Sequence, residues 1–362
     1  MTIAALAVAT SCGKSDTPTA ASGPVDVRLV VSSGNNTRVG SDAKDNDIRQ
    51  LRVYAFNADG KKVGYAEADN LKGQNYIPIT LSEGGDINFY VIANDNFGPK
   101  PTVGTTSVTD WTSLSKTDLE SLKFDLSEFS GWSTTDDFVS PMSNNLKDEF
   151  GNDLENNNAY SNPVTVTKPT SGSLVIPVTV QHVLGRLRLM LNKESDDVTI
   201  TLKRAAVYNR PDYFLLYNSG SADIKYDNNK SLVDEFVVSD IPLETTQKEV
   251  ARTYLAPNQY GTYDKTGGKF TTEGGDQTEV GKDKAYCLKL TVEFAYTTGT
   301  TDTTGTSETK NYTVNYTVYL PRVPRNTSID VQGTFKGTVV KPEFNVMTEA
   351  WVEKVMDIPA FE

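Results

Sequence analysis

Apolar and polar side chains alternate one by one along much of this sequence, and a period of two is typical of β-strands with one buried face. The first such run covers residues 25–31, where Val25, Val27, Leu29 and Val31 form the apolar side. Residues 87–93 are almost continuously apolar, which favours a strand that is covered on both faces. Further strand-like runs cover residues 48–56, 174–180, 187–191, 198–202, 286–294 and 312–320.

The last two of these runs form the clearest pair. Residues 297–310 between them are rich in Thr and Gly, so the pattern predicts a long β-hairpin. Only residues 111–122 favour a helix, because Thr117 and Glu120 have the spacing of a capping box. Its apolar stripe consists of Leu114, Leu119 and Leu122. Many strands and one helical insert predict an all-β fold of antiparallel sandwiches.

Length and composition add the number of domains and narrow the classes of function. A chain of 362 residues exceeds one ordinary hydrophobic core, so we expect two domains with a boundary near residues 181–185. At 37% hydrophobic and 23% charged residues, the chain can bury such cores. The net charge of −12 is spread along the chain and repels phosphate, which argues against a nucleic-acid partner. One His and two Cys cannot form a His/Cys zinc site or a disulfide framework.

The sequence carries no motif of a known catalytic or metal-binding class, such as a nucleophile elbow, a Walker loop or a zincin helix. His182 is flanked by apolar residues and is interpreted as a structural histidine rather than a general base. Cys287 is interpreted as an ordinary side chain rather than a nucleophile. Asp42, Asp45 and Asp47 lack the spacing of a calcium loop and are interpreted as solvated charges. We therefore expect no cofactor and no metal.

Two candidate processing sites lie within the first forty residues. Residues 3–9 form an apolar stretch too short to span a bilayer, and small residues then precede Cys12, as in a bacterial lipoprotein signal. The alternative is an ordinary buried segment with a chance cysteine. Arg38 lies in a Gly/Asn/Asp-rich stretch between two predicted strands, the kind of loop that proteases prefer. An arginine in a loop is nevertheless more often just a solvated side chain.

In their order along the chain, these features resemble the fimbrillin (FimA-type) family of major fimbrial subunits from Bacteroidales bacteria. The motifs that carry the resemblance are Cys12, residues 25–31, Arg38, and residues 51–56, 117–123, 138–142, 182–188, 323–326 and 346–352. The chain departs from the family pattern in two respects: no Lys or Arg precedes the apolar stretch, and the Thr/Gly-rich segment 297–310 is long.

The resemblance implies two tandem transthyretin-like β-sandwich domains, with a short helical insert in the first. It divides the chain into a lipoprotein signal (1–12), a propeptide with a removable strand (13–38), an N-terminal sandwich (39–181) and a C-terminal sandwich (182–362). It further implies export to the outer membrane as a lipoprotein, with the lipid (palmitate) on Cys12. An arginine-specific maturation protease would then cleave between Arg38 and Val39.

The resemblance also implies a mode of assembly. Loss of the strand that carries Val25, Val27, Leu29 and Val31 would open an apolar groove, which a strand of another subunit fills by donor-strand exchange. The family's donor is the C-terminal segment, where the alternating residues are Met356, Ile358 and Ala360.

The expected function is a structural subunit of a cell-surface fimbria that supports adhesion and colonisation, without enzyme activity. Expected partners are other fimbrial subunits, including anchor and tip proteins, and the maturation protease. The sequence does not identify a ligand on a host or bacterial surface. Contact with a membrane is expected only through the lipid, before cleavage.

Four alternatives stay open. Within the family, an anchor subunit would keep its lipid and escape cleavage, and a tip subunit would lack a usable donor strand. A glycan-binding surface lipoprotein would need an exposed aromatic platform, whereas Trp111, Trp132 and Trp351 are scattered along the sequence. An outer-membrane hydrolase has the least support, because no catalytic motif accompanies it.

Overall fold

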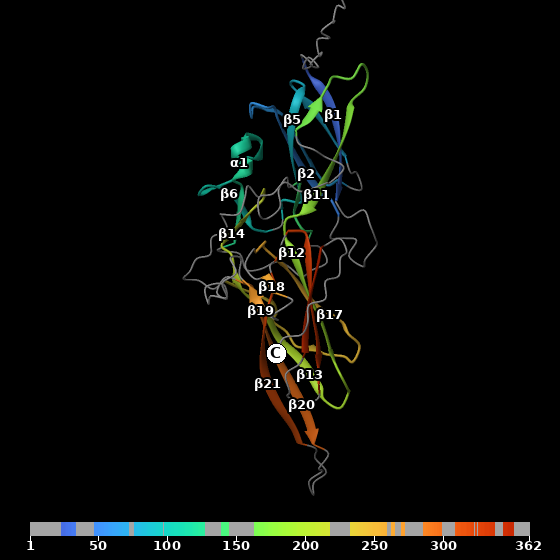
Figure 1. Cartoon of the computed structure of the whole chain (residues 1–362), viewed down its shortest axis with the longest axis vertical. Coiled ribbons are helices and arrows are strands. Elements are labelled where there is room, and N and C mark those ends of the chain that lie inside the picture. The colour runs from blue at the N-terminus through green and yellow to red at the C-terminus, as the bar shows by residue number, and fades with distance from the viewer. Residues whose placement is uncertain are drawn as a thin grey trace, which may run out of the picture.

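Strands dominate the structure, a computed structural model, and the expected all-β fold is confirmed. The residues that it describes are 23–33, 47–71, 76–96, 98–126, 139–144, 163–217, 232–258, 262–264, 269–271, 285–298, 308–321, 323, 325–336 and 343–350. Figure 1 shows an elongated molecule, with the first strands at one end and the long C-terminal hairpin at the other. No helix within these ranges is long and apolar enough to cross a membrane.

The strands near the N-terminus form two layers. One layer contains β3 (Lys62–Asp69), β2 (Gln50–Phe56) and β5 (Gly85–Ala93), with β10 (Val164–Val166) paired to β5. The other layer contains β11 (Leu174–His182), β1 (Val25–Ser33) and β4 (Tyr76–Leu81), in that order. In the described ladder, only the two-residue strand β9 (Met142–Ser143) joins β5 to β11. We call the group β11-β1-β4 the three-strand layer.

Apolar side chains from both layers meet in the first core, which draws on residues from Val25 to Val180. The layers also meet at β3 and β4, where the backbone of Gly64 lies against side chains of β4. A Cβ atom at Gly64 would lie only 2.7 Å from Cδ2 of Leu81, so this close approach requires glycine. The amide of Ser82 also donates to the carbonyl of Val63 at 2.8 Å.

A second sandwich follows in the C-terminal half. Its first sheet has the order β17 (Lys248–Leu255), β12 (Gly185–Lys193), β22 (Thr327–Phe335) and β23 (Glu343–Ala350). Its second sheet contains β15 (Leu232–Val237), β16 (Ile241–Pro242), β13 (Thr199–Arg210), β20 (Cys287–Thr298) and β21 (Glu308–Tyr319). The strands β20 and β21 pair from Cys287↔Tyr319 to Thr298↔Glu308, which confirms the predicted hairpin. The core between the sheets draws on residues from Leu187 to Val346.

A third core, rich in aromatic side chains, draws on residues from both of these regions of the chain. It includes Tyr54 from β2 and Tyr90 from β5. The opposite faces of these two strands point into the first core. Strand β5 is therefore buried on both faces, as its continuous apolar pattern predicts. Tyr217, Tyr254 and Phe214 join this core from the C-terminal half. Two small sheets complete the described strands. One has the order β14 (Tyr213–Leu215), β8 (Lys123–Asp125), β6 (Lys100–Val103) and β7 (Thr106–Ser107), and the other pairs β18 (Thr262–Asp264) with β19 (Lys269–Thr271).

A buried ion pair adds a polar tie across the same region. The guanidinium of Arg210 on β13 pairs with the carboxylate of Asp234 on β15, and both side chains are almost fully buried. Arg210 also donates to the carbonyl of Leu126, which follows β8, at 2.7 Å. One charged side chain thus connects the C-terminal sandwich to a segment from the N-terminal half.

The helical insert is present, but its start differs from the expected one. A 3-10 turn, η2 (Trp111–Ser113), precedes a single short helix, α1 (Lys116–Glu120). The helix cap is Ser115, whose hydroxyl accepts from the amide of Asp118 while the Asp118 carboxylate accepts from the amide of Ser115. The predicted capping box at Thr117 and Glu120 is therefore wrong, because Ser115 and Asp118 offer the same chemistry at the same spacing two residues earlier.

The two sandwich cores use consecutive parts of the chain. Strand β11 ends at His182 in the three-strand layer, and β12 begins at Gly185 in the second sandwich. The division into domains 39–181 and 182–362 remains a prediction.

Candidate functional site

The strand β1 contains the four residues that the sequence marks as a removable strand. Val25, Leu29 and Val31 are fully buried, and Val27 is 1% exposed. All four point into the first core. Fully burying four such side chains contributes on the order of 6–10 kcal/mol, at roughly 1.5–3 kcal/mol each. The segment before Gln50 therefore supplies an integral part of this core.

Both edges of β1 are paired, so it is the central strand of its layer and not an edge strand. It runs parallel to β11, with Val27 opposite Leu174 and Ser33 opposite Val180. It runs antiparallel to β4, with Val25 opposite Leu81 and Val30 opposite Tyr76. The alternation of apolar residues in the sequence indicates the strand but not that it has two partners. A strand between two others satisfies the backbone groups of both.

The outward face of β1 is also attached to β4. The hydroxyl of Thr80 donates to the carboxylate of Asp26 at 2.8 Å. The guanidinium carbon of Arg28 lies 3.5 Å from the centroid of the Tyr76 ring, which is a cation–π contact. Both outward contacts lie in the first half of β1.

Several predicted site residues lie outside the described residues. These are the lipidation candidate Cys12, the cleavage candidates Arg38 and Val39, and the donor candidates Met356, Ile358 and Ala360. Their roles remain predictions. Asp42, Asp45, Trp132 and Trp351 also lie outside the described ranges.

The candidate chemical groups that the structure does describe are buried. His182 is 1% exposed, and burial lowers its pKa to about 3, with Arg186 adding to the effect. Cys287 is 5% exposed, although the alternation puts it on the polar side of its strand, and its cross-strand neighbours are Tyr208 and Tyr319. Burial raises the pKa of its thiol. Within the described ranges, no group of three or more His, Cys, Asp or Glu side chains could hold a metal ion.

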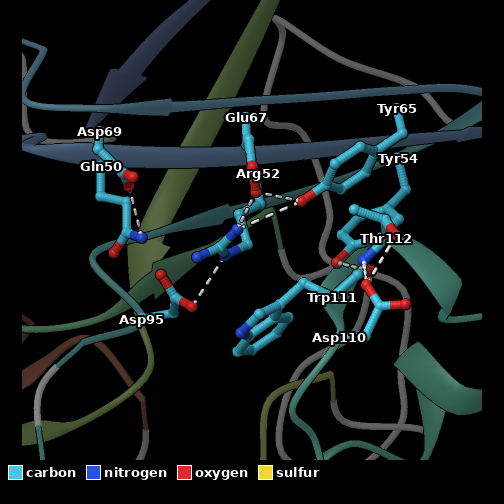
Figure 2. A network of polar contacts seen from close by, with 10 residues as sticks. All are labelled: Gln50, Arg52, Tyr54, Tyr65, Glu67, Asp69, Asp95, Asp110, Trp111 and Thr112. Atoms are coloured by element: carbon cyan, nitrogen blue, oxygen red, sulfur yellow. Dashed lines mark hydrogen bonds and ion pairs between the residues drawn. The ribbon is translucent and has the colours of Figure 1, made fainter.

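A polar network on β2 was not foreseen from the sequence (Figure 2). The Nε atom of Arg52 donates to Oδ2 of Asp95 at 2.9 Å, and its Nη1 atom pairs with Glu67. Burial raises the pKa of Asp95, and the hydrogen bond from Arg52 partly offsets this effect. Arg52 precedes Asp95 by 43 residues, so no local pattern could have indicated the pair.

The same network fixes Trp111 against the sheet. The guanidinium carbon of Arg52 lies 5.0 Å from the centroid of the Trp111 ring, and the hydroxyl of Tyr54 donates to the Trp111 carbonyl at 2.9 Å. Figure 2 shows the indole beside Arg52 and Asp95. The arrangement holds the 3-10 turn on β2 and leaves Trp111 in a polar contact, rather than in a flat aromatic platform for a sugar.

Comparisons with known proteins give the same overall architecture. No curated protein matches the chain. Among solved structures, the tip fimbrial protein Mfa3 from Porphyromonas gingivalis is similar with a TM-score of 0.52, at 14% identity, over 91% of this chain and 100% of that one. A fimbrilin (fimA) from Porphyromonas gingivalis W83 has a TM-score of 0.50, at 14% identity, over 93% of this chain and 98% of that one. At such identities the likeness shows the fold.

The family comes from the sequence itself. The family described as Major fimbrial subunit protein (FimA) matches residues 24–204, which begin just before β1 and make up half of the chain. That match includes the whole three-strand layer and the passage into the second sandwich. The resemblance found in the sequence is confirmed: this chain belongs to the FimA family of major fimbrial subunit proteins, which is a family of structural subunits and not of enzymes.

Proposed function

We propose that this chain is a shaft subunit of a cell-surface fimbria, which matures by losing β1 and polymerises by strand exchange. Membership of the FimA family supports a fimbrial subunit. The observation that carries the rest is the central position of β1 between β11 and β4. In the proposed order of events, the chain is exported as an outer-membrane lipoprotein with its lipid on Cys12. An arginine-specific protease then cuts it between Arg38 and Val39.

Loss of β1 would create a site that only another strand can fill well. The backbone groups of β11 and β4 that face β1 would lose their partners, and the positions of Val27 and Leu29 would become an apolar groove. A strand with apolar residues at every second position satisfies both needs at once. An incoming segment from a neighbouring subunit is therefore the natural occupant.

The proposed donor is the C-terminal segment that follows β23. Met356, Ile358 and Ala360 alternate with other residues, as an inserted strand requires. Pro359 has no amide proton, so it limits ladder bonds at that point to one edge. A donor segment and an acceptor groove formed by different parts of the chain make a head-to-tail contact between subunits that does not close, and such a contact generates a filament.

The test follows an arginine-specific protease acting on the purified precursor without its lipid signal. We expect a cut between Arg38 and Val39, followed by filaments in electron microscopy and by ladders on gels. The variant Arg38→Ala should abolish the cut and the filaments. Arg49→Ala is the matched control, since Arg49 is a half-exposed arginine just before β2, and it should change neither result.

Other outcomes would redirect the assignment within the family or away from it. Clean cleavage after Arg38 without assembly would contradict the shaft role and favour a tip or accessory subunit. Resistance to cleavage, with retention of the lipid, would favour an anchor subunit. Retention of the uncut protein on a polysaccharide gel would favour the glycan-binding lipoprotein.

A further inference from the structure

We propose that cleavage does not by itself release β1: the cut strand stays bound in the three-strand layer until another strand displaces it, beginning at the Ser33 end. This inference rests on the proposed function, because it describes how the same site changes its occupant. It concerns the state between the cut and the exchange.

The first argument is the lack of other partners for the two flanking strands. In the described ladder, β4 pairs with β1 alone. Within the described residues, the partner of β11 other than β1 is β9, at Gln181 and His182. An empty site would thus leave two strands of a core layer without their main ladder. Such an empty state has far more unpaired backbone than a groove beside an intact sheet.

The second argument is that the cut changes none of the contacts that hold β1. The proposed cleavage falls after Arg38, beyond the end of β1 at Ser33. The four buried side chains, the ladders to β11 and β4, and the contacts Asp26–Thr80 and Arg28–Tyr76 all lie within β1 itself. Hydrolysis of one peptide bond outside the strand leaves these interactions in place.

The third argument gives the direction of displacement, because the outward side-chain contacts of β1 and the proposed cut lie toward opposite ends of the strand. Residues from Val27 to Val30 are paired on both sides. In the described ladder, Val25 and Asp26 pair with β4 alone, and Val31 to Ser33 pair with β11 alone, so the ladder does not distinguish the two ends. The outward side-chain contacts at Asp26 and Arg28 lie toward the Val25 end. Release therefore begins at the Ser33 end, which lacks these described outward contacts and is also the end where the proposed cleavage produces a free terminus.

An incoming strand accordingly pairs first with Val178–Val180 of β11 and then proceeds toward Leu174 as β1 peels away. At every stage β11 and β4 keep a partner, so the empty layer never forms. The required occupant is a strand with alternating apolar residues, and the rate of release depends on how much of that strand is present.

The experiment uses the full chain with a site-specific protease sequence built into the segment 34–46, so that it does not depend on cleavage at Arg38. After the cut, the N-terminal fragment should co-elute with the remainder on gel filtration under native conditions. A fluorescent peptide with the sequence of residues 24–33 is then added. Its incorporation rate should rise in proportion to its concentration.

Two peptide variants form a matched pair on adjacent positions. In Leu29→Asp the charge replaces a fully buried inward side chain, and incorporation should be lost. In Val30→Asp the charge replaces a half-buried side chain that points outward, and incorporation should persist. The chain variants Val31→Ala and Val25→Ala test the direction, since both valines are fully buried. Val31→Ala should accelerate exchange more.

Loss of the fragment directly after the cut would overturn the inference, and so would an exchange rate that does not depend on peptide concentration. Equal acceleration by the two valine variants would overturn the direction. These outcomes differ from a failure of the proposed function. A cut chain that exchanges peptide but never forms filaments would keep this inference and remove the polymerisation, whereas filaments after immediate loss of the fragment would do the reverse.

Discussion

Arg28 lies over the ring of Tyr76 on the outer face of the three-strand layer, with 3.5 Å between the guanidinium carbon and the ring centroid. The pair joins the central strand β1 to β4, whose described ladder partner is β1 alone. It therefore ties the least supported strand of the layer to the strand that we propose is exchanged.

The substitution Arg28→Met keeps much of the side-chain length and removes the charge. We expect the free energy of unfolding to fall by about 0.5–1 kcal/mol, the usual range for a cation–π contact at an exposed site. Urea denaturation measures this change. Lys61→Met removes a positive charge from the turn between β2 and β3 and should be close to neutral; an equal loss in both variants would contradict the role of the ring.

Leu29 is the fully buried residue near the middle of β1, so its truncation probes the groove directly. We expect Leu29→Ala to lower the free energy of unfolding by about 2–5 kcal/mol, because it leaves a cavity in the first core. The neighbour Val30 points outward and is half-buried, and Val30→Ala should cost less than half as much. Similar denaturation midpoints for the two variants would show that the two faces of β1 are not as unequal as described.

Gly64 marks the contact between β3 and β4. A Cβ atom there would lie 2.7 Å from Cδ2 of Leu81 and 3.1 Å from Cδ1 of Ile79. Gly64→Ala should therefore destabilise the chain by about 1–3 kcal/mol, as overpacked cores do. In a chain that already carries Leu81→Ala, adding Gly64→Ala should cost less stability than it does in the unchanged chain, because the side chain that the new Cβ atom would meet is shorter. A stable single variant would mean that β4 shifts away at little cost.

His182 makes stability depend on pH in the acid range. Its pKa is about 3 in the folded chain against an ordinary value of 6.5, so below pH 6.5 the unfolded chain binds a proton that the folded chain does not. The stability is thus full above pH 6.5 and declines as the pH falls toward 3. Between pH 7 and pH 5 the loss amounts to about 2 kcal/mol.

The variant His182→Gln tests this dependence. It removes the titrating ring, so its free energy of unfolding should vary less between pH 7 and pH 5 than that of the unchanged chain. The comparison uses the slope with pH and not the absolute stability, since the substitution of a buried residue lowers stability at every pH. Parallel slopes would exclude His182 as the source.

The local pattern was sufficient to predict individual strands and one hairpin, because both depend on neighbours along the chain. The alternation of Val25, Val27, Leu29 and Val31 predicted a strand with one buried face. It could not predict that β11 is the parallel partner, because Leu174 lies far along the chain from Val27. The period also treats Tyr312 and Val318 alike, yet the first is 48% exposed and the second 3%. Val318 packs in the core between the two sheets, whereas Tyr312 is not part of that core.

The polar network around Arg52 could not be predicted from local patterns either, because it also depends on contacts between distant parts of the chain. Arg52 and Asp95 form their pair only once β2 and the segment after β5 lie side by side. The prediction of the helix cap was wrong for a different reason. Two overlapping Ser/Thr-x-x-Asp/Glu patterns occur at residues 115–120, and the helix is capped by the first of them. Neither outcome is set by the order of residue types alone.

The parallel pairing of β1 with β11 also has a consequence for the order of folding. During synthesis β1 emerges before every other described strand and can pair with β4 once that strand has followed, but its other edge has no partner until β11 has emerged. Closing so long a loop is slow, because its entropic cost must be met before the parallel pairing contributes to stability. The first strand to be made is thus among the last to have both of its neighbours in place. Until β11 is in place, one edge of β1 stays open, and an unrelated strand can pair with that edge.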